Sequence, residues 1–147
     1  MNELKVYQQN ELSRLKDIDV ENKGKYTGFF YVLEWNEITK IGCTKSPYQR
    51  YMALKRNAEK YGSSKIGRIA ISVAHTNYRS NEKLIHEAFS SSRKDNTELF
   101  DIPFDEAIQL IPKNITYIDD SKEIDRKSDI FFKAMKCFTL GGKIWTN

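Results

Sequence analysis

The sequence predicts an α/β fold with a small, mainly antiparallel three-stranded sheet flanked by helices. Two β-prone runs, GFFYVLE from residue 28 and ITKIG from residue 38, follow each other closely and indicate a hairpin. Segments with helical periodicity then alternate with a third β-branched run, RIAISVA at 68–74. A length of 147 residues suits one domain that buries its own core.

The chain divides into three parts. Residues 1–27 have mixed charge and apolar positions near helical spacing, which predicts a helical N-terminal extension. Residues 28–111 contain the β-prone runs, so we predict that this segment forms the α/β domain. Residues 112–147 begin with a polar connector and contain the apolar run IFFKAMKCF at 130–138. This run predicts a C-terminal helix that either docks on the core or associates with a second copy.

The helix after the hairpin has clear signals at both ends. Ser46 is a suitable N-cap, Pro47 suits the first turn, and Gln49 stands at the third helical position, where it completes a capping box. Gly62 is a suitable left-handed residue just after the helix. We therefore predict a helix over 47–61.

Two more helices are predicted further along the chain. SNEKLIHEAF at 80–89 follows the third strand, and PFDEAIQLI at 103–111 ends before Pro112. Between them lie a polar loop and the short extended piece TELFDI at 97–102. The resulting order is two strands and a helix, then a strand and a helix, then a loop and a last helix.

The composition narrows the class of protein. No apolar run approaches the ~18 residues that a membrane-spanning helix requires, and the N-terminus does not resemble a secretory signal. We therefore expect a cytoplasmic protein with no membrane partner. Cys43 and Cys137 lie far apart and outside any zinc-binding or redox spacing, so both are expected to be reduced thiols.

Basic residues gather between positions 40 and 68, where eight Lys and Arg face only Glu59. Such a cluster suits a polyanion such as nucleic acid, although it is also typical of a solvated helix face. The candidates for contacts with nucleic-acid phosphates are Lys45, Lys55, Arg56 and Lys60.

Four other polar residues could carry chemistry: Tyr31 and Lys40 in the hairpin, Arg50 in the following helix, and Glu98 after a loop. Hydrolysis of a phosphodiester needs a group that orients or deprotonates water, cations that offset phosphoryl charge, and usually a carboxylate that holds a divalent metal. The four residues supply these groups. Each also has an ordinary interpretation, for example a half-buried strand tyrosine or a lysine that protects a sheet edge.

The length of the hairpin loop decides whether Tyr31 and Lys40 can share a site. Side chains alternate between the two faces of a strand, so both point the same way only with a two- or four-residue loop, for example with Leu33 opposite Lys40. A loop of odd length would place them on opposite faces.

The order of these residues resembles the GIY-YIG nuclease superfamily, particularly its branch in phages, large DNA viruses and mobile elements. Gly28-Phe29-Phe30-Tyr31 stands at the first motif, with Tyr31 as its tyrosine. Lys40-Ile41-Gly42, followed by Thr44, stands at the second. The sequence departs from the pattern in two ways, because Phe29 is added to the first motif and Lys40 replaces the tyrosine of the second.

The resemblance continues to residue 111. Arg50 matches the family arginine, EKLIHEAF resembles a later helix with His86, and Glu98 matches the metal-binding glutamate. The asparagine that some members carry after this glutamate has no counterpart, since Asn114 lies beyond the matched region.

The resemblance implies a Mg²⁺- or Mn²⁺-dependent endonuclease acting on DNA, with RNA as an alternative substrate. Glu98 would hold the metal, Arg50 would offset phosphate charge, and Tyr31 would orient or deprotonate water with help from Lys40 or His86. The cytoplasm would be that of a host cell if a phage encodes the protein. A competing interpretation is a degenerate nuclease-fold module that binds DNA or RNA without cleavage. A third is an interaction domain that forms a homodimer through the helix at 130–138.

Overall fold

The computed structural model describes residues 4–62 and 64–114. In chain order the elements are β1 (Lys5–Tyr7), the 3-10 helix η1 (Gln9–Glu11), α1 (Leu12–Asn22), β2 (Phe29–Trp35), β3 (Ile38–Thr44), α2 (Pro47–Tyr61), β4 (Ile66–Ile71), α3 (Tyr78–Ala88), the 3-10 helix η2 (Ser90–Ser92), β5 (Leu99–Phe100) and α4 (Phe104–Asn114). The C-terminal helix expected at 130–138 and its connector lie outside the described residues. None of the helices described is both long enough and apolar enough to cross a membrane.

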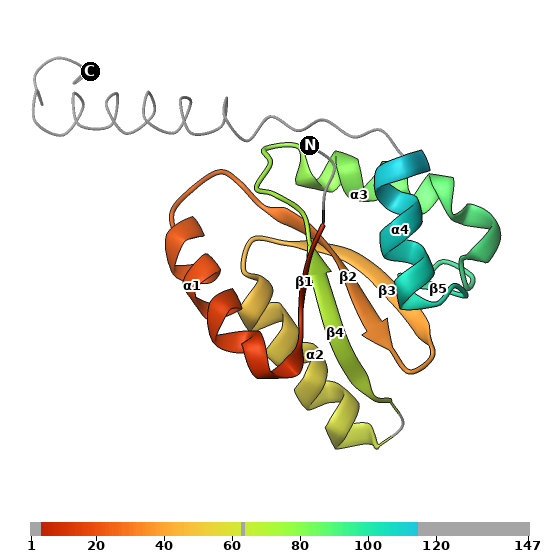
Figure 1. Ribbon diagram of the computed structural model, residues 1–147, viewed down its shortest axis with the longest axis horizontal. Coiled ribbons are helices and arrows are strands. Elements are labelled where there is room, and N and C mark those ends of the chain that lie inside the picture. Colours follow the sequence, from red (N-terminus) through yellow and green to blue (C-terminus); the bar gives the residue numbers. More distant parts are fainter. Residues whose placement is uncertain (1–3, 63, 115–147) are drawn as a thin grey trace, which may run out of the picture.

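The strands form a five-stranded antiparallel sheet in the order β1-β4-β2-β3-β5 (Figure 1). The α/β fold with an antiparallel sheet is confirmed, with the three predicted strands at its centre and a short strand added at each edge. The expected helical start of the chain is wrong for residues 5–7, which pair with β4. The free edge of β4 supplies backbone hydrogen-bond partners, and Tyr7 is buried there, so strand pairing replaces a helix.

The hairpin of β2 and β3 has the register on which a shared site depends. Its two-residue connection begins at Asn36, which has a φ of 56° that asparagine tolerates better than most residues. Leu33 lies opposite Lys40, and Tyr31 lies opposite Gly42. Tyr31 and Lys40 therefore point to the same face of the sheet, as predicted for an even loop.

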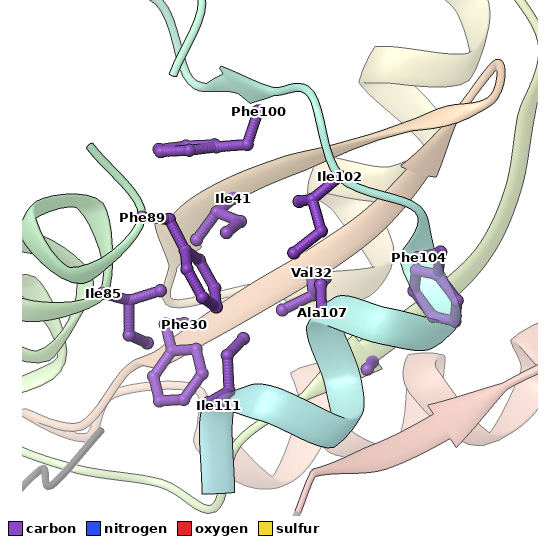
Figure 2. Close-up of a cluster of buried hydrophobic side chains, with 11 residues drawn as sticks. Phe30, Val32, Ile41, Ile85, Phe89, Phe100, Ile102, Phe104, Ala107 and Ile111 are labelled. Atoms are coloured by element: carbon purple, nitrogen blue, oxygen red, sulfur yellow. The ribbon is translucent and has the colours of Figure 1, made fainter. Parts of the chain in front are cut away.

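Alternation along β2 sends side chains into two hydrophobic clusters, one on each face. Phe30 and Val32 belong to the first cluster, which also receives side chains from α3 and α4 (Figure 2). Tyr31 and Leu33 belong to the second, together with Tyr51 of α2. Figure 1 accordingly shows α1 and α2 together on one side of the sheet and α3 and α4 on the other. Both faces of the central strands are buried.

α2 has the predicted bounds, and the residue that caps its C-terminus is Gly62, whose φ of 67° is left-handed. The predicted capping box is wrong, because Ser46 makes no side-chain cap hydrogen bond. Asp19 of α1 replaces it and accepts hydrogen bonds from the backbone N–H groups of Tyr48 (2.9 Å) and Gln49 (3.0 Å). A carboxylate satisfies two donors and also interacts favourably with the positive end of the helix dipole.

α4 continues past Pro112 to Asn114, although the sequence predicts an end at residue 111. Proline has no N–H to complete the helical hydrogen bond to the carbonyl four residues earlier. Ile111 is nevertheless fully buried in the first cluster. Packing of this residue holds the last turn in helical conformation.

We predict that Asp19→Ala lowers the free energy of unfolding by about 1 kcal/mol, because two N–H groups at the start of α2 lose their acceptor. Urea denaturation measures this difference. Asp17→Ala, which removes an exposed carboxylate from the same helix, is the matched control and should change stability little. Equal losses in the two variants would contradict the capping role of Asp19.

Candidate functional site

Gly42 lies where two oxygen atoms from distant parts of the chain meet. A Cβ atom on Gly42 would stand 2.5 Å from the hydroxyl oxygen of Tyr31 and 2.8 Å from Oε1 of Glu98. Both separations are shorter than the 3.0 Å below which real Cβ contacts essentially do not occur. Glycine at this position therefore leaves the space that the phenol and the carboxylate share.

Glu98 reaches this space because β5 pairs with the edge of β3. The backbone N–H of Ile41 donates to the carbonyl of Glu98 at 2.9 Å, and the next residue, Leu99, lies opposite Lys40. Phe100 is fully buried in the first cluster and anchors the short strand. The position of Glu98 thus depends on pairing between segments that are far apart in the sequence.

Lys40 forms an ion pair with Glu98. Its Nζ atom lies 3.2 Å from Oε1 of Glu98 and 5.7 Å from the centre of the Trp35 ring. The side chain of Lys40 is 17% exposed and that of Glu98 is 36% exposed, so the pair is only partly screened by water. The ammonium group consequently belongs to the site rather than to open solvent.

Arg50 approaches the same space from the first turn of α2. The Tyr31 hydroxyl and the charge of Glu98 both lie close enough to raise the pKa of Arg50. A surface hollow of about 340 Å³ lies beside it and is also lined by Lys45. This side of the site is therefore positively charged and open.

Tyr31 is fully buried, and its environment favours the neutral phenol. Burial and then the charge of Glu98 raise the pKa of Tyr31 to about 12, while Arg50 acts in the opposite direction. At neutral pH the group is therefore a phenol that can orient a water molecule by hydrogen bonding. The phenol would have to lose its proton before Tyr31 could act as a base.

His86 lies on α3, beside the first cluster, whereas Tyr31 belongs to the second. The Nε2 atom of His86 is 2.9 Å from the carbonyl oxygen of Ile41. Because a carbonyl can only accept a hydrogen bond, Nε2 carries a proton and donates it. The ring packs against Phe100, with 5.1 Å between ring centres. His86 and Glu98 line a common hollow of about 490 Å³, so His86 approaches Glu98 from the other side of the sheet edge.

Sequence reasoning missed Glu82, a largely buried carboxylate that lines the same hollow. Its Oε1 accepts a hydrogen bond from the thiol of Cys43 at 3.5 Å, and its Oε2 lies 3.9 Å from Nε2 of His86. Burial raises the pKa of Glu82, and the nearby His86 acts against this rise. The spacing of four residues between Glu82 and His86 places both on one helix face and is the sequence signal that could have revealed the pair.

The thiol of Cys43 is poorly suited to act as a nucleophile. Burial, together with the charge of Glu82, raises its pKa to about 12. A thiol needs its deprotonated form to attack, and that form is rare at neutral pH here. We therefore interpret Cys43 as a small packing residue of β3.

The predicted phosphate contacts do not all lie beside the site. Lys45 shares the hollow with Arg50. Residues of an α-helix are separated by about 100°, so Lys55 is rotated by about 140° from Arg50, and its side chain is partly buried. Arg56 and Lys60 are exposed along the outer side of α2. Lys45 therefore adjoins the site, and the other three lie further along or around the helix.

The fold is the first indication of the class of protein. A five-stranded antiparallel sheet with four α-helices in the described part of the chain is consistent with an α/β nuclease-like fold. The chain belongs to the T5orf172 domain family, which matches residues 28–114 and so covers more than half of its length. This phage-associated domain is related to GIY-YIG or HNH-like nuclease modules. No curated protein and no solved structure gives a significant match.

The donor groups of the site suit a particular kind of metal. Across residues 4–62 and 64–114, no cluster of three or more His, Cys, Asp or Glu side chains could enclose an ion. Glu98 is the carboxylate that meets Tyr31 over Gly42, and its side chain is partly open to solvent. Mg²⁺ commonly binds to one or two carboxylates together with water and substrate phosphates. An ion at this site would therefore be held by Glu98 together with water and substrate phosphate, as is common for Mg²⁺.

We predict that Gly42→Ala destabilises the protein by about 1–3 kcal/mol, because the new methyl group forces the buried Tyr31 side chain or Glu98 to move. The free energy of unfolding in urea measures the loss. A Tyr31→Leu background is the control, because it removes the end of the ring that the new methyl group meets, so Gly42→Ala should cost less stability there than in the wild type. Equal losses in the two backgrounds would argue against close approach at the site.

A second prediction concerns alkaline pH in the metal-free protein. The pKa of Tyr31 is about 12 in the folded state, against 10.0 ordinarily, so the folded state keeps a proton that the unfolded chain releases. The stability from this group is complete below pH 10 and is lost as the pH rises through 12, by about 2–3 kcal/mol in total. Tyr31→Phe should therefore lose less stability between pH 10 and 12 than wild type does. An equal loss of stability in Tyr31→Phe and in wild type over this pH range would argue against a buried, protonated Tyr31.

Proposed function

We propose that this chain is a metal-dependent endonuclease of the GIY-YIG type that hydrolyses DNA phosphodiester bonds. The main support is the meeting of the Tyr31 and Glu98 oxygens over Gly42, with the cations of Lys40 and Arg50 beside them. Membership of a nuclease-related, phage-associated family supports the same conclusion.

Each of these side chains has a role suited to its chemistry. A Mg²⁺ or Mn²⁺ ion held by Glu98 would supply Lewis-acid stabilisation of the phosphoryl oxygens. Tyr31, as a neutral phenol, would orient the attacking water. Arg50 would bind the scissile phosphate through its fixed fork of donors and would offset the charge that develops there.

The proton of the attacking water needs an acceptor other than Tyr31, whose pKa of about 12 keeps it protonated. Lys40 donates to Glu98 as an ammonium group and has no lone pair to offer. His86 uses Nε2 to donate to Ile41, so its Nδ1 is the nitrogen that would accept the proton. Of the three residues predicted to handle this proton, His86 is therefore the one that could accept it.

The basic side chains would guide the substrate without reading its sequence. Lys45 would contact the phosphate next to the one at Arg50, and Arg56, Lys60 and Lys55 would add weaker contacts. Contacts of this kind make binding strongly salt-dependent and carry little base information. The enzyme would act in the cytoplasm, including that of a host cell, and a homodimer formed through residues 130–138 would let two sites cut both strands.

A second candidate is a nuclease-fold module that binds DNA or RNA without cleavage. The ion pair between Lys40 and Glu98 favours it, because a carboxylate that is neutralised by an ammonium group is a weaker metal ligand. The high pKa of Tyr31 agrees with a lost catalytic role as well. Both candidates predict binding of nucleic acid, and only the first predicts metal-dependent products.

Cleavage of supercoiled plasmid with Mg²⁺ or Mn²⁺ at low salt tests the proposal. Wild type should nick or linearise the plasmid, and EDTA should stop it. Glu98→Gln and Arg50→Ala should each lose at least about 100-fold in rate while still retarding DNA in a gel. Glu106→Gln and Arg14→Ala remove an exposed carboxylate and an exposed guanidinium that line neither hollow beside the site, and both variants should cleave as wild type does.

The possible outcomes separate the two candidates. If wild type and variants are equally inert on DNA and RNA with both metals, yet retard nucleic acid in a gel, the chain is a binding module. If they neither cut nor bind, both candidates are wrong. Cleavage of RNA but not of DNA would support the proposed hydrolysis of phosphodiester bonds and would show that the substrate is RNA.

A further inference from the structure

Lys40 interacts with one particular oxygen atom of Glu98. The ammonium nitrogen lies 3.2 Å from Oε1. The same Oε1 is the oxygen that approaches Gly42, where a Cβ would stand 2.8 Å from it and 2.5 Å from the Tyr31 hydroxyl. The atom that faces the centre of the site is therefore the atom already paired with a cation.

We propose that Lys40 competes with the divalent metal for Oε1 of Glu98 and thereby makes tight metal binding depend on the presence of nucleic-acid phosphate. This inference rests on the proposed function, since it takes Glu98 as the metal ligand. It assigns Lys40 a role that follows from its charge and position and that a tyrosine at the same place would not have.

The balance of charge explains the dependence on phosphate. Lys40 and Arg50 face Glu98 on one side of the site. The hollow on its other side is lined by Glu82 and Glu87 against Lys83 and Arg93, so the cations of the region outnumber its carboxylates by one. A divalent ion entering without substrate therefore adds charge to a region that is already net positive. A phosphate group would offset that excess, so metal and nucleic acid each favour the binding of the other. Such coupling is reciprocal by thermodynamic necessity.

The ammonium group has another position available once a metal displaces it. Its nitrogen lies 5.7 Å from the centre of the Trp35 ring, on the neighbouring strand, within the range of a cation–π interaction. The lysine side chain is a flexible chain of four methylene groups, so the ammonium can leave Oε1 without movement of β3. It then stays in the site, where it can contact a phosphate oxygen.

Titration of Mn²⁺ at low ionic strength, followed through the EPR signal of free Mn²⁺, tests the inference without any measurement of cleavage. Lys40→Met removes the charge and keeps a flexible side chain of similar length. It should bind Mn²⁺ roughly threefold to tenfold more tightly than wild type in the absence of DNA. Lys40→Arg keeps the charge and should bind no more tightly than wild type.

Two further variants complete the set. Lys83→Met removes an exposed lysine that lines the hollow containing Glu98 but is not paired with that residue, so it measures the general effect of net charge and should change affinity much less. Glu98→Gln should abolish the site. Adding a short DNA duplex should tighten Mn²⁺ binding by wild type and narrow its difference from Lys40→Met.

The outcomes distinguish a failure of this inference about Lys40 from a failure of the proposed function. If wild type and Lys40→Met bind Mn²⁺ with equal affinity and Glu98→Gln does not bind it, Lys40 does not compete with the metal. Glu98 would then remain the metal ligand. Weaker binding in Lys40→Met would overturn the competition as well. If Glu98→Gln binds Mn²⁺ as wild type does, Glu98 is not the ligand, and the proposed metal role fails with the inference.

Discussion

The register of the β2–β3 hairpin is the constraint on which the site depends. It places Gly42 opposite Tyr31 and Lys40 opposite Leu33. A shift of one residue would exchange the two faces of a strand and would move apolar side chains out of both clusters. Because both faces are buried, such a shift carries a large energetic cost. The geometry of the site is thus held by the hydrophobic core rather than by the polar residues themselves.

The edge strand β5 depends in turn on this hairpin. A strand of two residues has too few hydrogen bonds to form alone, and it persists because Phe100 is buried and because β3 offers a free edge. Its function in the fold is to carry Glu98 to the space over Gly42. The site therefore lies at the edge of the sheet, where helices from both faces can contribute side chains and solvent can enter.

Electrostatics distinguish the site from an ordinary buried cluster. The phenol of Tyr31 is neutral, so its burial carries no charge-desolvation penalty, and the carboxylate of Glu98 lies among cations. The region is consequently net positive and partly dry, which attracts an anion and strengthens its interactions once bound. These properties suit a phosphodiester.

Local pattern in the sequence determined the hairpin, the bounds of α2, and the residue types from which the site is made. Periodicity and end signals act over a few residues, and sequence reveals them directly. The tertiary structure alone decided that Glu98 meets Tyr31 over Gly42, that Asp19 rather than Ser46 caps α2, and that residues 5–7 form a strand. Each of these depends on which edge or donor the rest of the fold leaves available, and no local pattern carries that information.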